Sequence, residues 1–120
     1  GLAVTTHTTG EPRPLPPGVE LSAYRIVQEA LSNAIRHAPG AAVVVELSYH
    51  PTSLVIQVRN TAPTRPAPPS SGAGHGLLGM RERVAMLGGK LTTGPTADGG
   101  YQVVASLPAP AYTPPVEETA

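Results

Sequence analysis

The sequence has 120 residues, which suits one compact domain and is too short for two. Eight basic residues balance eight acidic ones, so the chain lacks the positive charge typical of nucleic-acid-binding proteins. The absence of cysteine excludes disulfides, cysteine-based zinc sites and thiol chemistry. No apolar stretch approaches the roughly 20 residues of a transmembrane helix. We therefore expect no direct contact with nucleic acid or with a membrane.

Prolines divide the chain, because proline neither continues a helix interior nor donates to a sheet ladder. They form three clusters: Pro12, Pro14, Pro16 and Pro17; Pro63, Pro66, Pro68 and Pro69; and Pro108, Pro110, Pro114 and Pro115. We interpret each cluster as a connector. The clusters predict one domain over residues 1–108, followed by a disordered tail over residues 109–120.

The hydrophobic pattern between these connectors predicts both helices and strands. In chain order, the expected elements are a strand at 2–8, a helix at 20–38, a hairpin at 41–48 and 53–59, a helix at 77–87, and a hairpin at 90–93 and 101–107. The first helix is predicted from apolar residues at spacings of three and four: Leu21, Tyr24, Val27, Leu31, Ala34, Ile35 and Ala38. This order favours a two-layer α/β sandwich, in which helices cover one face of a mixed, mainly antiparallel sheet.

The first helix carries a polar face near its end. Glu29 and Asn33 are four residues apart and share this face, with Arg36 and His37 one turn further on. One interpretation is a solvated helix surface. The other is a site for a hard cation, because Mg²⁺ in nucleotide enzymes is typically held by one or two side-chain oxygens together with phosphates.

A glycine-rich segment precedes the second helix. Gly72, Gly74 and Gly76 alternate with other residues directly before the helical pattern. Glycine lets the backbone approach a ligand closely, and the free N–H groups of a helix N-terminus favour phosphate oxygens. The segment is therefore either a phosphate cradle or a flexible linker into the helix.

Two segments resemble a known family. The sequence EALSNAIRHA over residues 29–38 resembles the N box of the ATP-binding domain of sensor histidine kinases, in the superfamily that includes DNA gyrase. The sequence GHGLLGMRERVAMLGG over residues 74–89 resembles the G2 box and following helix of the nitrate-sensor and desaturase-thermosensor group. The resemblance implies a Bergerat-type ATP-binding fold with ATP and Mg²⁺ as cofactors.

The resemblance also implies roles for individual residues. Asn33 would be the Mg²⁺ ligand, and Glu29 would position the metal's water or assist proton transfer. Arg36 and His37 would lie near the phosphates. The remaining expected contacts lie in the ATP lid, at Gly72, Gly74, His75, Gly76 and Leu77.

One motif departs from the family pattern. The family usually carries D-x-G-x-G after the second hairpin strand, and its Asp accepts a hydrogen bond from the adenine amino group. Here Asn60 takes the Asp position, while Ala62 and Thr64 replace the glycines. An amide oxygen still accepts this bond but without charge assistance, which roughly halves its strength. The resemblance thus implies weaker and less adenine-selective binding, unless Thr61 or a water compensates.

The resemblance implies that the chain is the cytoplasmic catalytic domain of a membrane-bound sensor histidine kinase. It would transfer the γ-phosphoryl group of ATP to a His on separate dimerisation helices, for relay to a response regulator with a LuxR-type DNA-binding domain. None of His7, His37, His50 and His75 lies in the expected acceptor context. The isolated domain is therefore expected to lack autophosphorylation. Two alternatives are a degenerate, nucleotide-independent interaction module and an anti-sigma-factor serine kinase.

Overall fold

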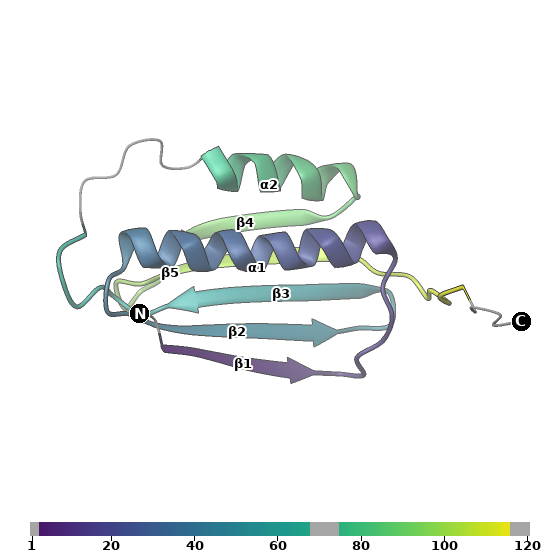
Figure 1. The fold of residues 1–120 in the computed structure, drawn as a ribbon, viewed down its shortest axis with the longest axis horizontal. Helices are drawn as coiled ribbons and strands as arrows, with labels where there is room; N and C mark the ends of the chain where they lie inside the picture. The colour runs from purple at the N-terminus through teal and green to yellow at the C-terminus, as the bar shows by residue number, and fades with distance from the viewer. Residues whose placement is uncertain (1–2, 68–74, 116–120) are drawn as a thin grey trace, which may run out of the picture.

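The computed structural model describes residues 3–67 and 75–115, which form one sheet and two helices (Figure 1). The elements in chain order are β1 (Ala3–Thr9), α1 (Pro17–His37), β2 (Ala42–Tyr49), β3 (Ser53–Asn60), α2 (His75–Met86), β4 (Lys90–Pro95) and β5 (Tyr101–Pro108). Every predicted helix and strand is present, with boundaries that agree to within three residues. None of the described helices is long and apolar enough to cross a membrane.

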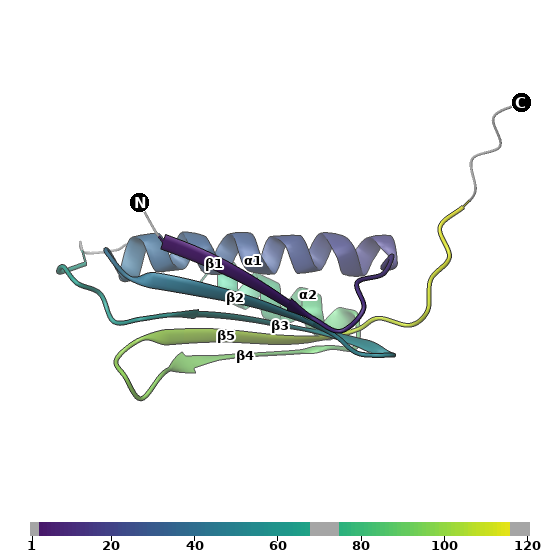
Figure 2. The ribbon, with the colours of Figure 1, turned by 90° about the horizontal axis from the view of Figure 1, so that it is seen from below.

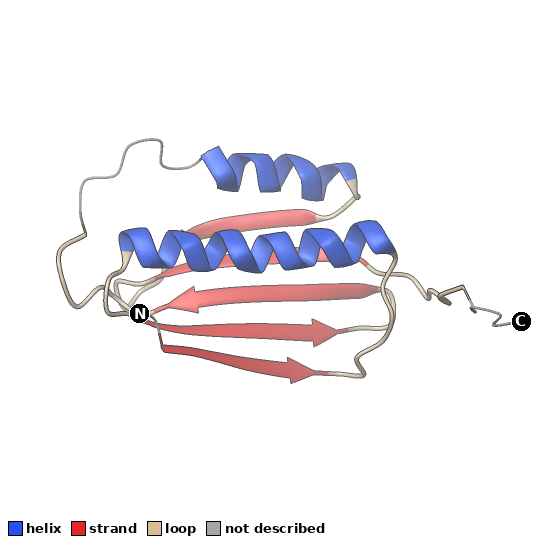
Figure 3. Cartoon of the chain, in the orientation of Figure 1, coloured by secondary structure: helices blue, strands red, loops and turns tan. Residues whose placement is uncertain are grey.

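The five strands form a mixed sheet in the order β1-β2-β3-β5-β4 (Figure 3). β1 pairs with β2 in parallel, because α1 carries the chain back across the sheet between them. The other three pairings are antiparallel. The predicted mixed, mainly antiparallel sheet is therefore confirmed.

Both helices lie on the same face of the sheet (Figure 2). α1 packs over β2, β3 and β5, whereas α2 packs over β4 and beside α1. Along the central strands, buried side chains that face the helices alternate with more exposed side chains on the other face, as expected for a sheet with one covered face. The fully buried members of this aliphatic core include Ile26, Leu54, Ile56, Val84 and Leu107.

The first helix differs from its prediction in two ways. It begins at Pro17 rather than at residue 20, because proline is favourable in the first turn, where its missing N–H has no intrahelical partner. The buried face is also different. Tyr24 and Ile35, which belong to the predicted apolar stripe, are 65% and 60% exposed, whereas Ala34 and Ala38 of the same stripe are buried together with Ile26 and Ala30.

The packed part of the chain extends one residue beyond Pro108. Ala109 is fully buried, and its N–H donates to the carbonyl of Thr52 over 2.9 Å. Its own carbonyl accepts a 2.7 Å hydrogen bond from Arg13 Nη2. Arg13 therefore ties the segment after β1 to the segment after β5.

Candidate nucleotide-binding site

A cavity of about 560 Å³ lies between the C-terminal half of α1 and the ends of β3 and β5. The start of α2 and the turn between β4 and β5 complete its wall. Its lining residues are Ala30, Asn33, Ala34, His37, Ala38, Val58, Asn60, Pro63, Leu77, Gly99, Gly100, Tyr101 and Val103. This size and this mainly apolar lining are typical of small-molecule sites.

Asn60 is the buried polar group of this wall. It is the last residue of β3 and is only 9% exposed. Its Nδ2 donates a 2.8 Å hydrogen bond to the carbonyl of Thr61, which fixes the orientation of the amide. The hydroxyl of Thr61 accepts from the backbone N–H of Ala42, and Thr61 does not line the cavity. Thr61 therefore does not replace Asn60 as a polar group of the cavity.

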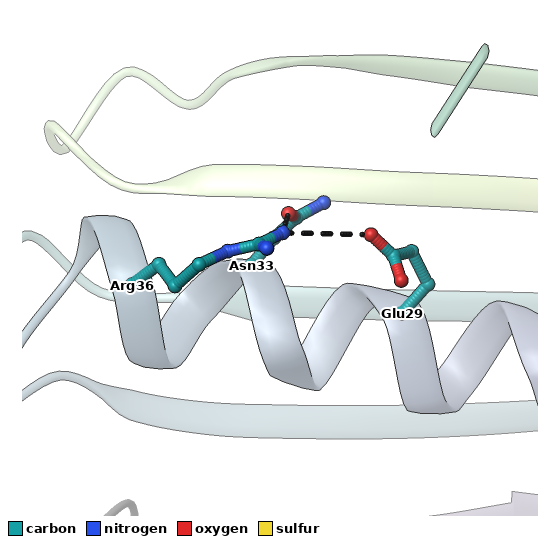
Figure 4. Close-up of polar contacts among 3 residues, drawn as sticks. All are labelled: Glu29, Asn33 and Arg36. Atoms are coloured by element: carbon teal, nitrogen blue, oxygen red, sulfur yellow. Dashed lines mark hydrogen bonds and ion pairs between the residues drawn. The ribbon is translucent and has the colours of Figure 1, made fainter. Parts of the chain in front are cut away.

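Asn33 and Glu29 place two oxygen atoms on the same side of α1 (Figure 4). Arg36 Nη2 donates to Asn33 Oδ1 and also lies 3.5 Å from Glu29 Oε1. Both oxygens thus approach one positively charged group. The side chains of Arg36 and Glu29 are 49% and 30% exposed, so solvent screens this ion pair and its contribution to stability is below about 1 kcal/mol.

The described residues include no cluster of three His, Asp or Glu side chains that could hold a metal ion. A cation at Asn33 would therefore need further ligands from a bound molecule. Mg²⁺ is commonly held in this way, by one or two protein oxygens together with substrate phosphates and waters. The oxygens of Asn33 and Glu29 fit such a site.

A second hollow lies between α1 and α2, with Glu29 and Gly76 on its wall. The Glu29 carboxylate lies directly against the Cα of Gly76 in the first turn of α2. The backbone N–H groups of a first helical turn lack intrahelical partners and carry partial positive charge, which favours a nearby carboxylate. This contact connects the polar face of α1 to the start of α2.

The turn that closes the cavity is held by Asp98. Its Oδ1 accepts hydrogen bonds from the hydroxyl of Thr96 and, over 3.2 Å, from the N–H of Gly100. These bonds, first the one from Thr96 and then the one from Gly100, hold the pKa of the Asp98 carboxyl below its ordinary value. Gly100 lies against the carbonyl of Asn60, where a Cβ atom would overlap the backbone. The turn therefore sits directly beside Asn60.

The structure brings several of the predicted site residues together. Asn33, His37, Asn60 and Leu77 line the main cavity. Glu29 and Gly76 line the second hollow, and Arg36 contacts both Glu29 and Asn33.

The other predicted residues lie elsewhere. Ala62 does not line either hollow, although a Cβ atom on Gly99 would be 3.4 Å from its side chain. Gly72 and Gly74 lie outside the described residues. His75 begins α2, and its side chain is also outside the described part of the chain.

The sequence analysis missed the wall contributed by β3, β5 and their neighbouring turn. Val58, Val103 and Tyr101 line the cavity together with Gly99 and Gly100. Part of this wall was predictable from the sequence, because alternation along the two strands places Val58 and Val103 on the covered face. The pairing of Asn60 with Tyr101 was not visible, since it depends on the register between β3 and β5.

Together, a helix-covered mixed sheet and an apolar cavity bordered by polar groups from α1 and β3 define a small-molecule-binding α/β domain. A sequence model of the family described as "Histidine kinase-, DNA gyrase B-, and HSP90-like ATPase" matches residues 18–111. The chain therefore belongs to this family of ATPases.

Its curated relatives are sensor kinases. Sensor histidine kinase YxjM of Bacillus subtilis is 35% identical over 109 residues, which are 90% of this chain and 26% of YxjM. The histidine-protein kinase/phosphatase DegS of Brevibacillus brevis is 30% identical over 90% of this chain and 28% of DegS. The histidine-protein kinase/phosphatase UhpB of Salmonella typhimurium is 39% identical over 71% of this chain and 16% of UhpB. The chain thus spans about a quarter or less of the length of these relatives.

Solved structures of histidine kinases share the fold. Full-length ShkA in complex with AMPPNP superposes with a TM-score of 0.74 and 20% identity, over 97% of this chain and 27% of ShkA. The mycobacterial sensor histidine kinase MprB superposes with a TM-score of 0.66 and 20% identity, over 92% of this chain and 86% of MprB. The Bergerat-type fold expected from the N box and G2 box is therefore confirmed.

Proposed function

We propose that this domain binds ATP with Mg²⁺ and supplies the γ-phosphoryl group to a histidine on the dimerisation helices of a sensor kinase. From there the group passes to a response regulator with a LuxR-type DNA-binding domain. The observation that carries the proposal is the pairing of an apolar cavity at Asn60 with an oxygen pair, Asn33 and Glu29, at the neighbouring helix.

The cavity suits the base and the sugar of a nucleotide. Its walls are mainly aliphatic, and the buried amide of Asn60 offers polar atoms to the edge of a flat heterocycle. Asn33 and His37 border the same cavity from α1. A nucleotide with its base at Asn60 would therefore direct its phosphates toward Asn33, Arg36 and the start of α2.

The polar face of α1 suits the phosphates and their metal. Mg²⁺ held by Asn33 would neutralise charge on the β- and γ-phosphates. Arg36 already lies beside Asn33 and provides a positive group for phosphate oxygens. Glu29 lies one turn away from Asn33 and would orient a water or accept a proton. Phosphoryl transfer depends mainly on such positioning and charge stabilisation.

The relatives named above include sensor kinases of the DegS and UhpB type, which supports the transfer step of the proposal. This chain offers no histidine in an acceptor context, so the acceptor belongs to other helices of the same kinase. The proposed setting of the domain is cytoplasmic, as its resemblance to sensor kinases implies. We expect the isolated domain to bind ATP but to incorporate no label from γ-labelled ATP on histidine. Acid-labile, base-stable label on the isolated domain would contradict this division of labour.

Thermal unfolding tests the binding step. At about 100 times its dissociation constant, a ligand adds roughly 2.7 kcal/mol to stability, which raises Tm by several degrees in a domain of this size. We expect ATP or ADP to raise Tm in the presence of Mg²⁺. The Mg²⁺-dependent part of the shift should be lost in Asn33→Ala.

The matched control is Glu82→Gln, an exposed residue of α2 outside both hollows, which should retain the full shift. No shift at millimolar nucleotide in the wild-type domain would reject the proposed ATP binding. The alternative of a nucleotide-independent interaction module would then be favoured.

A further inference from the structure

Asn60 offers two kinds of hydrogen-bonding group to the cavity. A side-chain amide carries one carbonyl oxygen and two N–H donors. Within the described residues, Asn60 uses a single N–H, in the bond from Nδ2 to the carbonyl of Thr61. Its Oδ1 and its second N–H are left for a ligand.

No other buried polar side chain of the described chain lines this cavity. Ser22 is the second buried polar side chain, and it lies outside the cavity lining. The surrounding wall near Asn60 is formed by Val58, Val103, the half-buried Tyr101 and the glycines of the β4–β5 turn. Within the described residues, the amide of Asn60 is therefore the buried side-chain group that is available to the polar edge of a bound base.

The chemistry of this amide differs from that of a carboxylate. An ionised Asp or Glu only accepts hydrogen bonds, so it favours a base with an amino group and disfavours a base with a carbonyl group at the same position. An amide can accept from the amino group through Oδ1 and donate to the carbonyl through Nδ2. It is also uncharged, so its bond to an amino group lacks charge assistance.

We propose that Asn60 allows this site to take both 6-aminopurine and 6-oxopurine nucleotides. The inference rests on the proposed function, because it requires the purine base to lie in the cavity at Asn60. A 6-aminopurine donates from its exocyclic amine to Oδ1. A 6-oxopurine accepts at O6 from the second N–H of the same amide. The two classes of nucleotide carry the same phosphates, so any difference in their affinity arises at the edge of the base.

The test compares ADP with IDP, whose bases differ in the group at position 6 and in the adjacent N1, which accepts a hydrogen bond in ADP and donates one in IDP. Titration calorimetry with Mg²⁺ measures both affinities for the wild-type domain. We expect IDP to bind within about tenfold of ADP, because Asn60 pairs with either edge. If ADP binds and IDP binds more than about a hundredfold more weakly, the inference fails while the proposed ATP binding stands. If neither binds, the proposed function fails and the inference fails with it.

The variant Asn60→Asp keeps the shape and the acceptor but removes both N–H donors, the one that would face the base and the one bonded to the carbonyl of Thr61. We expect its preference for ADP over IDP to rise by about tenfold or more, because the carboxylate leaves O6 of the base unpaired in a buried site. An unchanged ratio in the folded variant would overturn the role of Asn60. Circular dichroism checks the fold, and the wild-type comparison remains decisive if the variant does not fold.

The control is Asn33→Ala, which alters the side of the cavity formed by α1. It should weaken ADP and IDP by a similar factor and leave their ratio within about twofold of the wild-type value. This result would separate base recognition at Asn60 from metal and phosphate binding at Asn33. A change in the ratio as large as that of Asn60→Asp would contradict the assignment to Asn60.

Discussion

The carboxylate of Glu29 in α1 lies against Gly76 in the first turn of α2, so closely that a Cβ atom on Gly76 would overlap it. The two residues are far apart in sequence, yet this contact joins the two helices beside the proposed phosphate site. Gly79, one turn further along α2, has open space at the same position. The pair Gly76 and Gly79 therefore offers a matched test of the contact.

Gly76→Ala is expected to weaken nucleotide binding. Its methyl group would overlap the Glu29 carboxylate, so this flexible side-chain end would have to move away from the proposed phosphate site. Gly79→Ala should leave binding unchanged and raise stability by about 0.5–1 kcal/mol, since Ala is the better helix former. Calorimetry with Mg·ADP and urea unfolding provide the two measurements. Equal effects of both variants on affinity would show that the Glu29 contact has no influence on the site.

Two isoleucines of α1 test which face of the helix is buried. Ile26 is 1% exposed and Ile35 is 60% exposed. Ile26→Ala should lower the free energy of unfolding by about 2–5 kcal/mol, because it removes buried methyl groups and leaves a cavity. Ile35→Ala should change it by less than about 0.5 kcal/mol. Urea denaturation of both variants measures the difference, and similar losses at the two positions would reject this orientation of α1.

Asp98 should make stability depend on pH in the acid range. Its hydrogen bonds from Thr96 and Gly100 lower the carboxyl pKa in the folded state. A lowered folded pKa contributes stability that is fully present above the unfolded value and is lost as the pH falls through the folded value. Relative to wild type, Asp98→Asn should be less stable at pH 7, and this difference should shrink below about pH 4. Chemical unfolding between pH 7 and pH 3 measures it; a constant difference would contradict the linkage.

The order and type of the elements could be predicted from the sequence because they depend on local patterns. Alternating β-branched residues identified the strands, and apolar spacing identified α1 and α2. The polar residues of α1 were also predictable as a group, since Glu29, Asn33 and Arg36 share a face through helical geometry alone. The structure confirms that these side chains are neighbours, because Arg36 contacts both Glu29 and Asn33.

The burial of α1 was not predictable in the same way. Leu21, Tyr24 and Ile35 of the predicted apolar stripe are exposed, whereas Ala34 and Ala38 of the same stripe are buried together with Ala30, which the stripe did not include. The helix carries apolar residues over more than one face, so spacing alone could not choose between them. Packing against the sheet selected the face with the small side chains of Ala30, Ala34 and Ala38, which leave room for the cavity that they line beside Asn33.

By itself, the sequence determined which chemical groups this domain carries: the oxygens and guanidinium of the first helix, the amide of Asn60 and the glycines before the second helix. Only the tertiary structure decided how they meet. The register of β3 with β5 places Tyr101 opposite Asn60, and the Asp98 turn closes the wall beside them. Such contacts join residues distant in sequence, so they arise from strand pairing and helix packing, which no local pattern encodes.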